Sequence, residues 1–199
     1  MANWIKRYGE IPLERKNFQK ILSFYLFQCP CETQKWSKKE KTIMYSRVSA
    51  RGNTLRQRGW TGGHLKTLLA AMKDTTSKQL TYSHLPCNKD ILSEVKAIED
   101  NSTLSDPNFE MIVIVKRSDM TLTSSIFYYI RNALAHGSFR VNGDVYSFES
   151  SKDGTMKAAI RLREKTLLKW IEDVSLSPEK LKKVLQSERK TTKKGKRAA

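Results

Sequence analysis

Residues 121–137 have the sequence TLTSSIFYYIRNALAHG, and this stretch predicts a helix that ends at a glycine. Thr121 or Thr123 can cap the start, because a threonine hydroxyl accepts a backbone N–H group at a helix N-terminus. Gly137 is suited to the other end, because glycine adopts the left-handed conformation of a helix C-cap at little cost. The stretch therefore predicts a helix over residues 121–136.

One side of this predicted helix is polar. At 3.6 residues per turn, four polar residues share a stripe, namely Ser125, Tyr129, Asn132 and His136. Arg131 lies beside Asn132 and about 140° away from His136 around the axis. For the two tips to meet, the arginine must curl or the last turn must loosen at Gly137. Alternatively, two such helix ends meet across the axis of a symmetric dimer.

Downstream of the helix the pattern changes to short alternating runs, over residues 138–141, 145–149 and 156–162. They are separated by Asn-Gly-Asp at 142–144 and by Lys-Asp-Gly at 152–154, which are strong turn signals. The pattern predicts a small antiparallel β-meander.

Most of the remaining chain is predicted to be helical. Apolar residues at helical spacing predict helices over residues 13–27, 64–72, 90–98 and 164–174, and a last helix that begins at Pro178. Residues 109–116 are rich in β-branched side chains, so they form either a strand or the start of a buried helix. We therefore expect a mainly α fold.

The predicted organisation is one domain followed by a tail. The domain spans residues 1–188, with a basic N-terminal half over 1–108 and the helix and meander within 109–174. Residues 189–199 contain six basic and no acidic side chains, which predicts a disordered basic tail.

The overall charge favours polyanionic partners. The 199-residue chain has 37 Lys and Arg against 20 Asp and Glu, for a net charge of +17. No apolar run approaches the roughly 20 residues of a membrane span, so no membrane partner is expected. The N-terminus lacks the apolar segment of a secretory signal, which predicts a cytoplasmic protein. Three cysteines, an odd number, argue against a disulfide framework.

Much of this positive charge lies in residues 35–58, where eight basic side chains accompany a single acid and are interleaved with Trp36 and Tyr45. This window either guides RNA through phosphate contacts and base stacking or is a solvated loop made basic for solubility. Under the first interpretation, the predicted RNA-binding residues of the window are Arg47, Arg51, Arg56 and Arg58, and Tyr129 on the polar stripe of the 121–136 helix is predicted to bind RNA with them.

Arg131, Asn132 and His136 are the candidate catalytic residues, and their chemistry fits RNA phosphodiester transesterification. An imidazole exchanges protons near neutral pH, and a guanidinium offers a charged fork to a phosphate. Asn132 can hydrogen-bond the phosphate or orient His136. This scheme requires no metal or cofactor. In the structural alternative, Asn132 caps a neighbouring loop, His136 hydrogen-bonds a carbonyl and Arg131 lies on the surface.

A second chemical possibility is zinc. Cys29, Cys31, His84 and Cys87 supply four suitable ligand types. Zinc knuckles more often separate their cysteines by two residues, so we favour buried free thiols over a metal site.

The octapeptide Ile-Arg-Asn-Ala-Leu-Ala-His-Gly at residues 130–137 resembles the signature of the HEPN superfamily, which is Arg, a polar residue, a short spacer and His at a helix end. The segment from Ser138 to Trp170 resembles a plasmid- and mobile-element-borne branch of that superfamily. The resemblance implies a small helical bundle, usually a homodimer, with a composite metal-independent RNase site. Branches paired with a nucleotidyltransferase antitoxin carry a tyrosine where this chain has Ser138.

Together these features predict a metal-independent endoribonuclease of the defence, abortive-infection or toxin type. The expected partners are RNA, a second copy of the chain and an antitoxin or regulatory protein. The alternative is a noncatalytic RNA- or nucleotide-binding module. The resemblance leaves this open, because some members of the superfamily keep the fold without catalysis.

Overall fold

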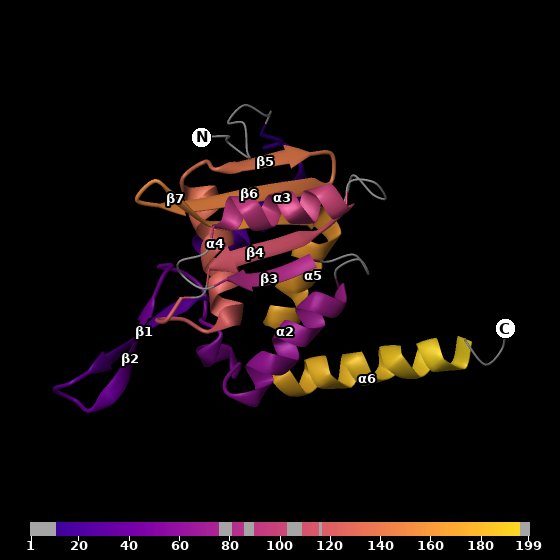
Figure 1. Ribbon diagram of the computed structural model, residues 1–199. Coiled ribbons are helices and arrows are strands. Elements are labelled where there is room, and N and C mark those ends of the chain that lie inside the picture. Colours follow the sequence, from indigo (N-terminus) through magenta and orange to yellow (C-terminus); the bar gives the residue numbers. More distant parts are fainter. Residues whose placement is uncertain (1–10, 76–80, 86–89, 103–108, 116, 196–199) are drawn as a thin grey trace.

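The computed structural model describes residues 11–75, 81–85, 90–102, 109–115 and 117–195, and its centre is a five-stranded β-sheet. Across the sheet the strands are β3 (Thr81–Leu85), β4 (Met111–Val115), β7 (Thr155–Arg163), β6 (Val145–Lys152) and β5 (Phe139–Asn142) (Figure 1). β3 and β4 are parallel, and the other neighbours are antiparallel. The prediction of a mainly α, HEPN-like helical bundle is therefore wrong, because the fold combines helices with a large sheet.

The predicted meander is present as β5, β6 and β7, but it is the larger part of this sheet and not an addition to a bundle. β7 continues the sheet by pairing with β4, in a register that places Met111 opposite Arg161. Residues 111–115 are therefore a strand, which resolves the ambiguity of their sequence. Every residue of β4 is buried. The strand therefore lacks the alternation of polar and apolar residues that identifies a half-exposed strand.

One face of the sheet is covered by α3 (Ile91–Ser102), which lies across the front of the sheet in Figure 1. Parallel strands require a crossover connection, and α3 supplies it between β3 and β4. Its apolar residues Ile91, Val95 and Ile98 form a core cluster with alternate residues of β4.

The opposite face carries the larger core. The helices here are α1 (Lys16–Leu22), which continues as the π-helical turn η1 (Ser23–Phe27), α2 (Gly63–Thr75), α4 (Leu122–Ala135) and α5 (Glu164–Ser175). Phe18, Phe127 and Trp170 are completely buried in this core. Tyr25, Trp60 and Trp170 in this core donate hydrogen bonds to backbone carbonyls; for example, Trp170 Nε1 donates to Met72 O over 3.0 Å.

Two elements project from this body (Figure 1). One is a hairpin of β1 (Glu32–Ser37) and β2 (Thr42–Arg47), which the sequence analysis did not predict. The other is α6 (Pro178–Gly195), which begins at the predicted proline. Residues 189–195 are helical and do not form the predicted disordered tail, whereas residues 196–199 lie outside the described part of the chain.

Candidate functional site

α4 carries the three candidate catalytic residues, and its start is fixed by a side-chain cap. Thr121 is extended, and its hydroxyl oxygen accepts the backbone N–H of Ser124 over 3.2 Å, which confirms the predicted capping role. The helix packs between η1 and β6, with Phe127 and Ile130 completely buried. The body of the protein therefore holds the C-terminal end of α4 in place.

That end closes as the sequence predicts. Gly137 has a φ of +64°, and its N–H donates to Leu134 O over 3.3 Å. The N–H of Ser138 donates to Ala133 O over 2.8 Å. These two bonds form a Schellman motif, which satisfies carbonyls at the helix end and turns the chain into β5. His136 is the C-cap residue, and its side chain is exposed.

We expect Gly137→Ala to lower the free energy of unfolding by about 1 kcal/mol, because an alanine is strained at positive φ. A Cβ at this position would meet nothing within 4 Å, so the cost is conformational and not steric. Gly63→Ala, at the start of α2 with equally open surroundings, is the control and should be neutral or slightly stabilising. Urea unfolding compares the two; equal stabilities would contradict this account of the helix end.

Arg131 is half-buried and has an unusual environment. Its Nε atom is buried and has no hydrogen-bond partner. Among the described residues no carboxylate pairs with this guanidinium. A guanidinium is always charged, and burying one of its donors without an acceptor is costly. An anion bound by the guanidinium would offset its positive charge.

The thiol of Cys31 lies near Arg131. Cys29 and Cys31 are both buried, and their sulfur atoms are 3.3 Å apart. The contact with Cys29 and burial raise the pKa of the Cys31 thiol, and the Arg131 guanidinium opposes that shift. Buried thiols at these two positions agree with the interpretation that the sequence favoured. In the described part of the chain no group of three His, Cys, Asp or Glu side chains is placed to hold a metal ion, and Cys87 and the side chain of His84 lie outside that part.

Asn132 and His136 have different surroundings from Arg131. Asn132 Nδ2 donates to Ser150 Oγ on β6 over a long 3.4 Å, whereas His136 faces solvent. Among the described contacts, none joins the side chains of Arg131, Asn132 and His136 to one another. The structure therefore places the three at one helix end without bringing their tips together in one copy.

The four predicted RNA-binding arginines lie after or at the end of β2. Arg51 is exposed, and Arg47 donates to Gln57 Oε1 over 2.9 Å. Arg56 donates to the buried Glu32 over 3.1 Å, and Arg58 Nε donates to Asn53 O over 3.0 Å. Three of the four arginines thus have local partners, which orient their guanidinium groups.

Tyr129 is buried, although its predicted role in RNA binding requires an exposed side chain. Its side chain is only 4% exposed, and its hydroxyl donates to Val115 O over 2.9 Å. It therefore presents no ring face to RNA, and its assignment as an RNA-binding residue is a mistake. The helical stripe was correctly traced, but Ser125 and Tyr129 at its start are covered by the body of the protein. Only the end of the stripe is accessible.

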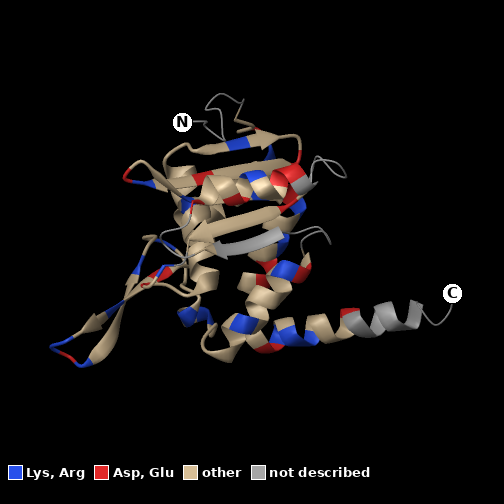
Figure 2. Cartoon of the chain, in the orientation of Figure 1, with Lys and Arg blue, Asp and Glu red and all other residues tan. Residues whose placement is uncertain are grey.

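The sequence identified Trp36 and Tyr45 within a basic window but did not predict the hairpin that exposes them, on which Trp36 is 60% exposed. The signal was present, because TIMYSR over Thr42–Arg47 is rich in β-branched and aromatic residues. The lysines around it dominated the interpretation. Figure 2 shows Lys and Arg along this hairpin and on the described start of α6.

No helix in the described part of the chain is long and apolar enough to cross a bilayer. Comparisons with protein-family models, with curated proteins and with solved structures each found no match for this chain.

Proposed function

We propose that the protein binds RNA and cleaves it at the C-terminal end of α4. The observation that carries this proposal is the half-buried Arg131, whose Nε donor is buried without an acceptor. A phosphate bound by the guanidinium would supply a compensating negative charge. The net charge of +17 also favours a polyanionic ligand.

The proposed reaction is transesterification. The RNA 2′-oxygen loses its proton to a base and forms a bond to the adjacent phosphorus, while the bond from phosphorus to the 5′-oxygen breaks and the 5′-oxygen takes up a proton. His136 is the proposed proton carrier, because its exposed imidazole can meet an RNA strand at the surface. Arg131 is proposed to bind the phosphate and Asn132 to hydrogen-bond it. The products are a 2′,3′-cyclic phosphate and a 5′-hydroxyl, and the scheme needs no metal or cofactor.

We further propose that two copies supply one site. Arg131 and His136 are separated by about 140° around the axis of α4, so pairing ends from two chains brings the groups together more readily than bending one chain. Measurement of the solution mass tests this step. A dimer is expected, and a protein that cleaves RNA as a strict monomer would contradict it.

The biological setting rests on the motif. The resemblance of residues 130–137 to the HEPN signature supports a cytoplasmic effector of defence, abortive infection or toxicity, with an antitoxin or regulatory partner. The helical bundle of that superfamily is not part of the proposal, because the sheet of this protein excludes it.

A second candidate is a noncatalytic RNA- or nucleotide-binding module. It is favoured by the observation that Arg131 and His136 do not contact each other in one copy. This candidate predicts tight binding of RNA with no product at any enzyme concentration, whereas the first predicts binding and turnover.

The test is incubation of the full chain with unstructured RNA in the presence of EDTA. The wild type should cleave, and Arg131→Met should cleave about 10² to 10³ times more slowly, because methionine keeps the aliphatic packing without the charged donors. Circular dichroism verifies that the variant is folded. Intact RNA with the wild type, or equal rates for the two proteins, would reject the catalytic proposal.

A further inference from the structure

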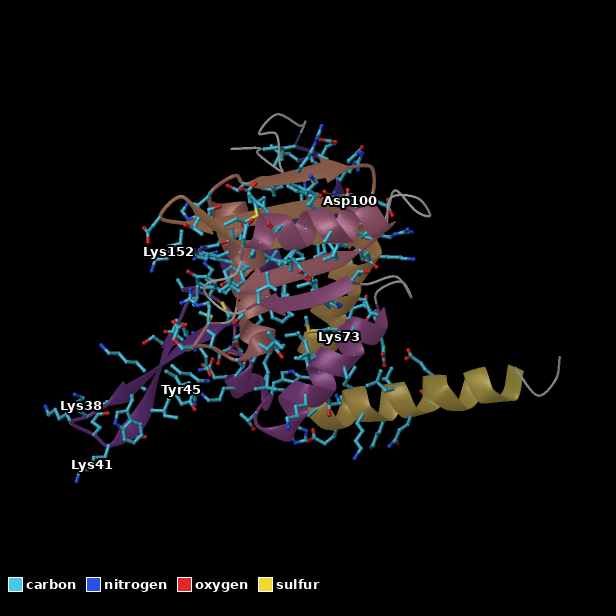
Figure 3. The ribbon with its side chains drawn as sticks, viewed as in Figure 1. Lys38, Lys41, Tyr45, Lys73, Asp100 and Lys152 are labelled. Carbon is cyan, nitrogen blue, oxygen red and sulfur yellow. The ribbon has the colours of Figure 1, made fainter. Side chains whose placement is uncertain are left out.

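The β1–β2 hairpin is built as a two-stranded arm that extends beyond the body of the protein (Figures 1 and 3). Its base is anchored, because the N–H of Gln34 donates to Asp119 O over 2.7 Å and that of Val48 donates to Cys31 O. All six residues of β2 are exposed, so this strand presents both faces to solvent. Such an arm adds little to the core and is positioned to contact a partner.

One face of the arm carries aromatic side chains. The register pairs Trp36 with Ile43 and Gln34 with Tyr45, and directly opposed residues share a face. Trp36 and Tyr45 are therefore diagonal neighbours on that face, within reach of each other's long aromatic side chains. Their side chains are 60% and 39% exposed, respectively. Two aromatic rings with this relation form a platform on which successive unpaired bases can stack.

The platform is partly fixed in advance. The guanidinium of Arg56 lies 4.3 Å from the centroid of the Tyr45 ring and is itself held by Glu32 at 3.1 Å. Arg56 covers one face of the ring, which leaves the opposite face for a base. A ring that is already oriented loses less conformational entropy when it binds.

The exposed charged side chains of the arm favour a negatively charged partner. Exposed lysines lie on β1 and in the turn, together with the exposed acid Glu40. They are Lys35, Lys38, Lys39 and Lys41. Figure 3 shows Lys38 and Lys41 at the far end of the arm and Tyr45 nearer the body. Lys38, Lys39 and Lys41 at the tip attract a phosphate backbone, whereas a second copy of the arm would bring like charges together.

From this combination we infer that the arm binds single-stranded RNA, with unpaired bases stacked on Trp36 and Tyr45 and the backbone following the lysines. This inference rests on the proposed function and identifies the form of RNA that the protein takes. A duplex is disfavoured, because its bases are already stacked on one another and the major groove of A-form RNA is too narrow for side chains to read.

The experiment measures binding of a fluorescein-labelled 2′-O-methyl RNA of about 12 nucleotides, a length within the usual site size of such platforms. This RNA cannot be cleaved by attack of a 2′-hydroxyl, so the result does not depend on whether the protein is a nuclease. The double variant Trp36→Ala/Tyr45→Ala should bind roughly 20-fold or more weakly. Trp36→Phe should retain most of the affinity, because it keeps a stacking ring.

Phe27→Ala is the matched control. Phe27 is an aromatic residue with 53% exposure, but it belongs to η1 and not to the arm, so its removal should leave the affinity unchanged. Charge is tested by Lys38→Gln/Lys39→Gln/Lys41→Gln, which should reduce the slope of log affinity against log salt by about 2.

Three outcomes would overturn the inference. In the first, the double variant binds RNA with the same affinity as the wild type and stays a dimer. Alternatively, it binds RNA normally but changes from dimer to monomer, which would make the arm an interface between copies. Finally, duplex DNA of equal length binds the arm more tightly than single-stranded RNA. Weaker binding by the double variant, with no cleavage of ordinary RNA by the wild type, would keep the inference and reject the nuclease.

Discussion

His136→Ala should lower the rate of RNA cleavage by about 10² to 10⁴, which is the usual contribution of a positioned proton-transfer group. The expected loss is in catalysis and not in folding, because His136 is an exposed C-cap residue. The Schellman bonds around it involve only backbone atoms and persist in the variant. Single-turnover cleavage at saturating protein measures the rate without a contribution from binding.

His64→Ala is the control for this experiment. His64 is also exposed but lies on α2, so its removal should leave the rate unchanged. Equal cleavage by His136→Ala and the wild type would remove the imidazole from the mechanism. A parallel loss in both histidine variants would indicate a nonspecific effect of removing histidine.

Trp170→Ala should lower the free energy of unfolding by about 3–5 kcal/mol, the range for truncating a large buried aromatic residue. Trp170 is completely buried, and its ring lies 6.4 Å from that of Phe127 in an edge-to-face arrangement. Its indole N–H also donates a hydrogen bond to Met72 O, so the variant leaves both a cavity and a carbonyl without its hydrogen bond. Trp170 thus links α5 to α2 and α4 on one face of the sheet.

Trp36→Ala is the matched control, because Trp36 is a tryptophan with 60% of its surface exposed. It should change stability by less than about 0.5 kcal/mol. Trp170→Phe gives an intermediate case that keeps a ring and loses the hydrogen bond. Urea unfolding followed by circular dichroism makes the comparison; a loss below about 1 kcal/mol for Trp170→Ala would contradict the packing described here.

Local signals predicted the elements that they control. The Thr121 cap and Gly137 defined α4, and both act within a few residues of themselves. Turn sequences at 142–144 and 152–154 located β5, β6 and β7 for the same reason. Elements whose ends are specified by neighbouring residues can thus be found without knowledge of the tertiary structure.

The fold class was predicted wrongly because pairing between distant strands has no local signal. β4 and β7 are separated by 39 residues, and the apolar run of β4 fits a buried helix as well as a buried strand. Once β4 is a strand, the meander becomes part of a large sheet. The β1–β2 hairpin was missed because its lysines suggested a loop, although its other side chains favour a strand.

For the candidate site, the sequence located the residues but not their surroundings. Periodicity placed Tyr129 and His136 on one stripe, yet the first is buried and the second exposed. The unpartnered Nε of Arg131 and its proximity to Cys31 depend on contacts between α4 and the start of β1, which no pattern within α4 contains.

We propose that this protein cleaves RNA through attack by the RNA 2′-hydroxyl groups, and the chemical ends of the products test this most directly. End-labelled RNA and its 2′-O-methyl counterpart are incubated with the wild type in EDTA. We predict that only the RNA is cleaved and that its fragments carry 2′,3′-cyclic phosphate and 5′-hydroxyl ends. RNA that remains intact, fragments with 3′-hydroxyl ends, or equal cleavage of the 2′-O-methyl strand would contradict the claim.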